Sequence, residues 1–494
     1  MSLILGLDTG GTYTDAVIIN KNSNKVIASS KSLTTYQNLV LGLNNCVSKV
    51  LGKLSKKNKN DIDLVVLSST LATNAVVSGI GEIINLILIG YDKNILNNNE
   101  IIKVTDGHFV NLINGGHDAQ GNELKKLDLK NLENIIKKNP VVTSYAITSQ
   151  FSVRNSNHEI EARKLIKKLT NLPVTCSHEL SLNLNGPKRA VTCVLNAKII
   201  GIIDNLIKNV ELMLIENNIS SQLMIVKGDG SLINTNIAKL KPVETIMSGP
   251  AAATIGASWL TNIKNAVVSD IGGTTTDISL ITFGTPNVNH EGSVIGGWKT
   301  MVEALDIQTT GLGGDSEVSV NLNKNNNSVI NIGPSRAVPL SQLACDYSQV
   351  INDLKTQLNN PLTSYTFGKF VWLKSSINKP SWLRPIESKI WDKLNNQFPI
   401  ALSDLAPNQS ILGAINRLIK YNLLGYSAFT PTDANHILNK YSKLNIEAAF
   451  LGAKILIKNK DIYGNFIAKD ITELSKIIFQ TMIIKTSESI FEYV

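Results

Sequence analysis

The chain has 494 residues, which is too long for one ordinary hydrophobic core, so we expect two or three domains. Apolar residues make up 43% and charged residues 18%, a composition that excludes an intrinsically disordered chain. The formal net charge of +9 comes from scattered lysines, and the densest cluster, Lys56, Lys57 and Lys59, lacks an aromatic-studded basic strand. We therefore expect no nucleic-acid partner.

The cysteines and the apolar runs indicate where in the cell the protein is located. Cys46, Cys176, Cys193 and Cys345 are far apart and form no C-x-x-C pair, which argues against a zinc knuckle and a disulfide framework. The apolar run Ile83–Ile89 is too short to span a bilayer, and no signal-peptide pattern precedes the first apolar strand. These features predict a cytoplasmic protein without a membrane partner.

The N-terminal part alternates short apolar runs with amphipathic stretches, the pattern of an α/β domain. The expected strands are Leu3–Leu7, Ala16–Ile19, Leu64–Leu67 and Ile84–Ile89. A helix is expected from Leu39 to Leu54, and another near Asn157, where Glu159 and Glu161 complement the helix dipole and His158 belongs to the capping turn. A turn-rich joint at 184–187 ends the first predicted domain, 1–185.

Two further parts follow this joint. The second predicted domain, 186–345, contains the expected helices Val191–Glu216 and Pro250–Leu260 and the expected strands Leu223–Val226 and Ala266–Ser269. A polar loop at 321–327 is expected to lie at the tip of a hairpin. The third part, 346–494, is predicted to be mainly helical.

An internal repeat is the most informative feature of the sequence. Asp8–Asp15, with the sequence DTGGTYTD, recurs as Asp270–Asp277, with the sequence DIGGTTTD. Both copies follow one expected strand and lead into another, so each is predicted to be a hairpin.

The residue types in the repeat suit phosphate and magnesium. A Gly-Gly pair lets backbone N–H groups approach an anion closely, and threonine hydroxyls can donate to phosphate oxygens. The acid at the end of the first strand can hold Mg²⁺. We therefore expect Asp8 and Asp270 to bind metal and both hairpins to bind the phosphates of one ATP. The predicted phosphate ligands are Thr9, Gly10, Gly11, Thr12, Thr14, Gly272, Gly273, Thr274, Thr275 and Thr276.

A simple Asp-Gly hairpin without a ligand is the alternative for either copy alone. No G-x-x-x-x-G-K-[ST] segment and no dinucleotide-type glycine fingerprint occurs in the sequence. A third glycine turn, Gly313–Gly314–Asp315, follows the second copy, and its glycines are expected near the terminal phosphates. The segment Ser248–Gly249–Pro250 opens a helix, for which close packing is as good an explanation as ligand contact.

Other polar groups leave two interpretations open. Asp106, His108, His117 and Asp118 lie in one turn-rich segment and could bind a second metal, or they could make ordinary turn hydrogen bonds. Thr73 and Asn74 could contact a substrate or cap a helix. His178, His290 and His436 are expected to be structural.

The paired hairpins resemble those of the sugar kinase, heat-shock chaperone and actin superfamily, and the chain is most similar to its hydantoinase A and 5-oxoprolinase branch. The matching stretches, in order, are Gly6–Asp15, Ser69–Ala75, Gln150–Glu159, Ser177–Glu179, Lys241–Pro250, Asp270–Asp277 and Pro431–Asn435. The resemblance implies two RNase H-like, actin-like ATPase lobes around a nucleotide cleft, with a mainly helical C-terminal part.

The resemblance also implies an activity, which is ATP-dependent opening of a cyclic amide such as a hydantoin or 5-oxoproline by phosphorylation of the amide oxygen, often with a second subunit. The chain departs from the family at Asp315, where a glycine is usual, so Asp315 could ligate metal, act as a base or change the substrate. A small-molecule kinase and a nucleotide-driven switch or assembly protein are the alternatives. The sequence determines neither the substrate, nor the general base, nor the oligomeric state.

Overall fold

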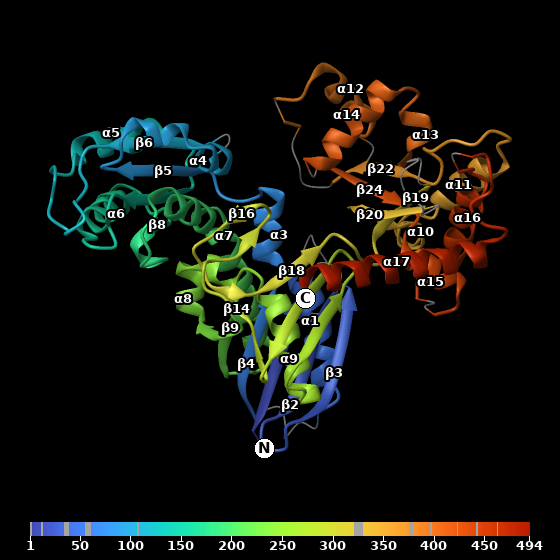
Figure 1. The fold of residues 1–494 in the computed structure, drawn as a ribbon, viewed down its shortest axis with the longest axis horizontal. Helices are drawn as coiled ribbons and strands as arrows, with labels where there is room; N and C mark the ends of the chain where they lie inside the picture. Colours follow the sequence, from blue (N-terminus) through green and yellow to red (C-terminus); the bar gives the residue numbers. More distant parts are fainter. Residues whose placement is uncertain are drawn as a thin grey trace. The chain divides into compact units, whose positions relative to one another are not determined.

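The computed structural model describes residues 2–10, 13–33, 39–54, 61–105, 108–320, 330–374, 379–380, 382–395, 398–421, 423–440, 443–461 and 463–494. The chain forms two compact units (Figure 1). The first unit comprises 1–268 and 279–307, and the second comprises 269–278 and 308–494. The predicted boundaries at 185 and 345 do not separate these units, and the three-part division stays a prediction.

The first unit contains a six-stranded sheet with the order β10-β9-β4-β1-β2-β3. Strands β1, β2 and β3 pair antiparallel, whereas β1, β4 and β9 pair parallel. The strands are β1 Leu3–Thr9, β2 Tyr13–Asn20, β3 Lys25–Leu33, β4 Ile62–Ser69, β9 Gln222–Val226 and β10 Leu232–Asn234. Alternate residues of β1 are buried, as expected for a strand with one face on the core. Helix α1 (Leu39–Leu51) packs on β2 and β3, and α9 (Ser248–Thr261) packs on β4 and β9.

Strand β9 corrects one expectation. It was expected in the second lobe, with its helix and the helix at 250–260, but it pairs with β4 and extends the sheet that begins the chain. Both helices also lie in the first unit, as α7 (Gly186–Glu216) and α9. Pairing between strands so far apart in sequence depends on long-range contacts, which periodicity does not report.

A second sheet of the first unit has the order β6-β5-β7-β8, and its pairs are all parallel. Its strands are β5 Ile84–Ile89, β6 Phe109–Ile113, β7 Ser144–Ser149 and β8 Val174–Cys176. Every residue of β5 and β7 is buried, because helices cover both faces of a parallel sheet. Helices α5 (Leu129–Lys138) and α6 (Asn157–Leu169) cover one face, and α4 (Asn99–Val104) and α7 cover the other.

Helix α7 passes through the core of the first unit. The 31-residue helix begins at an Asn185 cap, and its side chains pack with those of α1, α3 (Leu71–Ser78), β5 and β7. It is the one helix among the described residues that is long and apolar enough to cross a membrane, and 72% of its most apolar window is buried inside the fold. The burial marks it as a core helix.

The second unit is mainly helical in its C-terminal part, as expected. Its main core contains the hairpin of β19 (Ser316–Val320) and β20 (Ile330–Arg336) together with helices. The helices of this core are α10 Leu340–Asp346, α11 Val350–Asn359, α15 Pro431–Ile437, α16 Ile446–Ile457 and α17 Ile471–Tyr493. The predicted polar loop at 321–327 lies outside the described residues, between these antiparallel strands.

A smaller core of the second unit lies against a four-stranded sheet with the order β21-β24-β22-β23. Its elements are β21 Val338–Pro339, β22 Phe370–Leu373, β23 Ile400–Ala401, β24 Leu424–Ala428, α12 Pro385–Lys393, α13 Leu402–Leu405 and α14 Gln409–Lys420. A further sheet has the order β11-β12-β13 with β18 beside β12, from β11 Ala266–Ile271, β12 Thr276–Thr282, β13 Thr285–Pro286 and β18 Ile307–Thr310. The four cysteines are free thiols.

Candidate functional site

The first copy of the repeat forms the predicted hairpin between β1 and β2. Asp8 pairs with Asp15 across the ladder, and the Gly10 N–H donates to the Tyr13 carbonyl at 2.9 Å. A Cβ on Gly10 would come within 2.9 Å of that same carbonyl oxygen, so a larger residue here would force the turn to shift. The neighbouring Gly11 and Thr12 lie outside the described residues.

Asp8 is the penultimate residue of β1 and lies beside the end of β4, where the carboxyl ends of two parallel strands meet. The Ser68 hydroxyl donates to Asp8 Oδ1 at 2.6 Å, and the Thr70 N–H donates to the Thr9 carbonyl at 3.1 Å. The hydroxyl of Thr9 is buried and has no hydrogen-bond partner among the described residues. Ligands of open α/β sheets bind at this edge.

The start of helix α9 lies against the same edge. Ser248 Oγ accepts from the Ser69 N–H at 3.2 Å and donates to the Ser69 carbonyl at 3.0 Å. A Cβ on Gly249 would lie 3.2 Å from Thr70 Cγ2 and 3.8 Å from Asp8 Oδ1. Gly249 therefore leaves room beside the Asp8 carboxylate. Sequence reasoning did not find Ser68, and for Ser248–Gly249 it left helix packing as an equal explanation.

The second copy has the same turn. The Gly272 N–H donates to the Thr275 carbonyl at 2.9 Å, which matches the bond between Gly10 and Tyr13. The equivalent threonines Thr14 and Thr276 are both fully buried, and the Thr276 hydroxyl donates to the Leu312 carbonyl at 2.7 Å. Thr276 is therefore a structural residue of the hairpin.

The two acids of the second hairpin interact. Burial raises the pKa of Asp277 above its ordinary value, and the nearby Asp270 carboxylate raises it further. The Thr309 hydroxyl donates to Asp277 Oδ1 at 2.6 Å and opposes this effect. Two interacting carboxylates, one of them partly buried, favour a bound cation.

The third glycine turn packs directly on the second hairpin. The Gly314 N–H donates to the Gly272 carbonyl at 3.0 Å, and the Asp315 N–H donates to the Gly273 carbonyl at 2.6 Å. The Gly313 N–H donates to the Ser316 hydroxyl at 2.9 Å. A Cβ on Gly313 would come within 2.5 Å of the Gly273 carbonyl oxygen. The third turn thus lies beside the second hairpin, as its position in the sequence predicted. These three N–H groups already have acceptors within the protein, and the approach of Gly313 and Gly314 to phosphates stays a prediction.

Asp315 is held in a buried position beside this turn. Its Oδ1 lies 3.4 Å from the Thr432 hydroxyl, and its Oδ2 lies 3.8 Å from Arg336 Nη2. The Thr432 hydroxyl also donates to the Gly314 carbonyl at 2.9 Å. Thr432 lies in the first turn of α15, where buried Asp433 accepts from the Leu340 and Ser341 N–H groups. The segment Pro431–Asn435 therefore holds the third glycine turn in place.

The histidine and aspartate segment does not assemble as a metal site among the described residues. His108 Nδ1 accepts from the Ile84 N–H at 3.1 Å, and Asp118 caps its own turn by accepting from Gln120 and Asn122. The His117 ring lies 4.3 Å from the His158 ring. Asp106 lies outside the described residues. The described residues that come close enough to share a metal are Glu159, Cys176 and His178.

The helix start at 157 differs from the expectation. His158 is buried, accepts from the Gly116 N–H at 2.9 Å and lies 2.9 Å from Glu123, so it is not a capping residue. Glu159 is fully buried and accepts from Ser149, Ser177 and His178. Thr73 accepts from the Met247 N–H, and Asn74 donates to the Thr70 hydroxyl. These contacts are structural links within the first unit.

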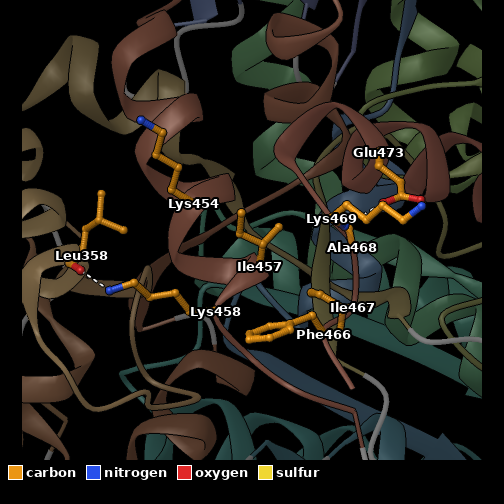
Figure 2. Close-up of a pocket in the computed structure, with 9 residues that line it drawn as sticks. All are labelled: Leu358, Lys454, Ile457, Lys458, Phe466, Ile467, Ala468, Lys469 and Glu473. Atoms are coloured by element: carbon orange, nitrogen blue, oxygen red, sulfur yellow. Dashed lines mark hydrogen bonds between the residues drawn. The ribbon is translucent and has the colours of Figure 1, made fainter. Parts of the chain in front are cut away.

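A cavity of about 670 Å³ lies on the second unit, away from the predicted residues in sequence (Figure 2). Ile457 and Phe466 form part of its apolar wall, and Lys454, Lys458 and Lys469 carry its positive charge. Lys458 Nζ donates to the Leu358 carbonyl. The described lining residues include none of the predicted site residues, and we assign no role to this cavity.

Comparison with known proteins identifies relatives over most of the chain. The profile of the hydantoinase/oxoprolinase N-terminal region matches residues 4–170, and the hydantoinase/oxoprolinase profile matches residues 189–452. The caprolactamase subunit alpha of Pseudomonas jessenii is 23% identical over 419 residues, which cover 79% of this chain and 58% of the relative. The acetophenone carboxylase gamma subunit of Aromatoleum aromaticum is 22% identical and covers 69% of this chain and 50% of the relative.

Two solved structures share the fold. A nucleotide-free acetone carboxylase matches with a TM-score of 0.60 at 19% identity, over 88% of this chain and 62% of that one. The ATP-dependent caprolactamase of Pseudomonas jessenii matches with a TM-score of 0.53 at 21% identity, over 85% of this chain and 62% of that one. The chain thus spans between 50% and 62% of the length of these relatives. Because a family profile covers more than half of it, the chain belongs to the hydantoinase/oxoprolinase family.

Proposed function

We propose that this chain is the ATP-using subunit of an amidohydrolase that opens a cyclic amide by phosphorylating its carbonyl oxygen. The main support is the repeated turn, in which the N–H groups of Gly10 and Gly272 make equivalent backbone hydrogen bonds of 2.9 Å and an aspartate precedes each glycine pair. Relatives described as ATP-dependent support the use of ATP. The caprolactamase relative supports a cyclic amide as the substrate class.

The residues at both hairpins fit a magnesium-bound polyphosphate. Carboxylate and hydroxyl oxygens are the ligands that Mg²⁺ prefers, and Asp8 with Ser68 and Asp270 with Asp277 supply them. The space that Gly249 leaves beside Asp8 admits a ligand atom. Asp8 and Asp270 would hold the ion, which would neutralise charge on the phosphates. We retain Thr9, Gly10, Gly11, Thr12, Thr14, Gly272, Gly273, Thr274, Thr275, Gly313, Gly314 and Asp315 as proposed site residues.

The proposed reaction balances as follows. The γ-phosphoryl group of ATP passes to the amide oxygen, and ADP leaves. Water then adds to the activated carbon, and the C–N bond breaks with a proton going to nitrogen, which leaves an acyl phosphate. A second water hydrolyses this acyl phosphate to a carboxylate and inorganic phosphate. Phosphorylation is needed because an amide is a poor electrophile. We further propose an actin-like arrangement of the nucleotide-binding parts and a cytoplasmic location.

A partner subunit is part of the proposal. The relatives are named as subunits alpha and gamma, and this chain spans between half and three fifths of their length. Assays should therefore include the protein encoded by the adjacent gene. A chain that turns over ATP with a cyclic amide only in the presence of this protein would support a two-subunit enzyme.

Calorimetric titration with a non-hydrolysable ATP analogue, with and without Mg²⁺, tests the nucleotide site first. We expect magnesium-dependent binding with one site per chain. ATP turnover is then measured with caprolactam, hydantoin and 5-oxoproline, and ring-opened product is identified by mass spectrometry. No analogue binding to a folded sample, alone and with the partner, would refute the proposed use of ATP.

ATP-dependent carboxylation of a ketone is the second candidate. It is favoured by the acetone carboxylase structure, which has a TM-score of 0.60, and by the acetophenone carboxylase relative. The two reactions differ in their second substrate. ATP turnover that requires bicarbonate and a ketone, with no response to cyclic amides, would decide for carboxylation.

A further inference from the structure

A second cavity, of about 610 Å³, lies in the first unit at the carboxyl ends of β5 and β7. These strands pair parallel, with Ile89 opposite Ser149. After them the chain continues into Tyr91 and into Gln150 and Phe151, all of which line the cavity. Small ligands bind at such an edge in parallel α/β sheets, and cavities of this volume suit small molecules.

The start of α7 forms another wall of this cavity. Asn185, Gly186, Pro187 and Arg189 line it, and α7 is 31 residues long. A helix of this length has a partial positive charge at its N-terminus. Gly186 lets Tyr91 lie against the helix, because a Cβ there would come within 2.7 Å of the tyrosine ring and hydroxyl. Burial raises the pKa of Tyr91 well above its ordinary value, so its hydroxyl stays protonated and can donate.

Arg189 is the residue that provides the main evidence for a bound ligand. It lines the cavity although it is 3% exposed, and its Nε–H has no acceptor among the described residues. Its Nη2 donates to the hydroxyls of Ser152 and Ser177. A buried guanidinium N–H without an acceptor is costly, so a bound acceptor at this position would stabilise it.

The nearest acid does not use this donor. Arg189 Nη2 lies 3.5 Å from Glu159 Oε1, beyond ordinary hydrogen-bond length, and Glu159 accepts from Ser149, Ser177 and His178 instead. Burial alone raises the pKa of Glu159, but the hydrogen bonds from His178 and Ser177 outweigh it and keep the pKa below its ordinary value. Glu159 is thus ionised and satisfied by other donors.

We propose that this cavity binds a small organic carboxylate, with Arg189 and Tyr91 as donors to its oxygens. Arg189, the N-terminus of α7 and the Tyr91 hydroxyl together favour an anionic oxygen acceptor. Asp92 is an exposed acid that also lines the cavity and weakens anion binding. The cavity lining includes no residue of either hairpin, so this inference does not depend on the proposed use of ATP.

A matched pair of ring compounds tests the charge preference. 5-Oxoproline and pyrrolidin-2-one share one lactam ring and differ by the carboxylate. Each is titrated calorimetrically into the full chain at low salt and without nucleotide. We expect 5-oxoproline to bind at least tenfold more tightly than pyrrolidin-2-one. Equal affinity for both compounds, or binding of neither, would overturn the proposal.

Two variants at the edge of the cavity locate the binding. Asp92→Asn keeps the side-chain oxygen that accepts from the Asn94 N–H, and it should tighten 5-oxoproline binding about twofold to threefold at low salt, with the gain lost at high salt. Tyr91→Phe should weaken binding about threefold to tenfold by removing one donor. Glu133→Gln is the charge-matched control on α5, outside the cavity lining, and should leave the affinity unchanged.

Arg189→Lys is the third variant and tests the guanidinium donor. It keeps the positive charge opposite Glu159 but removes the guanidinium donor, so we expect at least a tenfold loss of 5-oxoproline affinity. Circular dichroism checks that this variant is folded. The variants Asp92→Asn and Tyr91→Phe keep the test decisive if it is not, and unchanged affinity in both of them would refute the assignment of the cavity.

Discussion

The two hairpins share one turn but have different surroundings. The first lies within a six-stranded sheet, where β1 has buried alternate residues and Asp8 accepts from Ser68 on the adjacent strand. The second begins with β11, most of whose residues are exposed, and its glycines accept hydrogen bonds from the third glycine turn. The last aspartate of the repeat also differs between the copies. Asp15 forms an ion pair with Lys31 at 3.1 Å on the surface, whereas Asp277 accepts a hydrogen bond from Thr309.

This difference distinguishes the features that both copies of the repeat share from the contacts that are specific to one copy. Both copies keep the turn bond and the acid at the strand end, which are the parts that phosphate and magnesium need. Each copy is stabilised by different neighbours, a strand and a helix start in the first and a glycine turn in the second. Equivalent substitutions should therefore have equal effects on nucleotide binding and unequal effects on stability.

Asp8→Asn and Asp270→Asn should give the largest effects. Each removes one negative charge from a proposed metal ligand, so we expect Mg²⁺-dependent ATP turnover to fall at least about 100-fold in each, near 3 kcal/mol of transition-state stabilisation. Asp15→Asn is the matched control from the same ladder and should keep turnover within about twofold. A loss in one copy alone would show that the repeat is not functionally symmetric.

Alanine substitutions at three glycines of these turns should destabilise the protein more, the closer the nearest backbone oxygen lies to the new Cβ atom. A Cβ would lie 2.5 Å from the nearest oxygen at Gly313, 2.9 Å at Gly10 and 3.4 Å at Gly272. We expect Gly313→Ala to destabilise by about 2 to 3 kcal/mol, Gly10→Ala by about 1 kcal/mol and Gly272→Ala by less than about 0.5 kcal/mol. Thermal unfolding midpoints of the three variants test this order, and a larger effect at Gly272 than at Gly10 would contradict it.

Asp277→Asn and Asp15→Asn should have small effects of opposite sign at pH 7. The raised folded-state pKa of Asp277 means that stability falls as pH rises from its ordinary pKa through the raised value, so removing the charge should raise the Tm at pH 7 and lose this benefit in acid. Asp15→Asn removes an exposed ion pair and should lower stability by about 0.5 kcal/mol or less. Melting curves of both variants at pH 7 and pH 4 check the signs, and a lower Tm for Asp277→Asn at pH 7 would contradict the argument.

The sequence predicted local structure well where the signal was local. The strands at Leu3–Leu7 and Ile84–Ile89, the helix that becomes α7 and both turns of the repeat are observed. Glycine pairs between apolar strands have few alternative conformations, which is why the turns were predictable. The closeness of Gly313 and Gly314 to the second hairpin was also expected from their short separation in the chain.

Features that depend on distant contacts were not predictable. Ser248 bonds to Ser69 across 179 positions, and β9 pairs with β4 rather than starting a new sheet. From the sequence alone, the helix dipole explains Glu159, because it accounts for an acid in the first turn whether or not that acid is buried. Only the packing of β7 and the Ser177–His178 segment on α6 shows that it is buried.

The uninterrupted length of α7 has a consequence for how the first unit unfolds. At about 1.5 Å per residue the helix extends roughly 46 Å, and its side chains belong to the same core as those of both sheets. Neither sheet can lose its packing on this helix without exposing buried residues that also stabilise the other. We therefore expect the two sheets to unfold as one cooperative unit, and we expect amide hydrogens near the middle of α7 to exchange with solvent only when the whole unit opens.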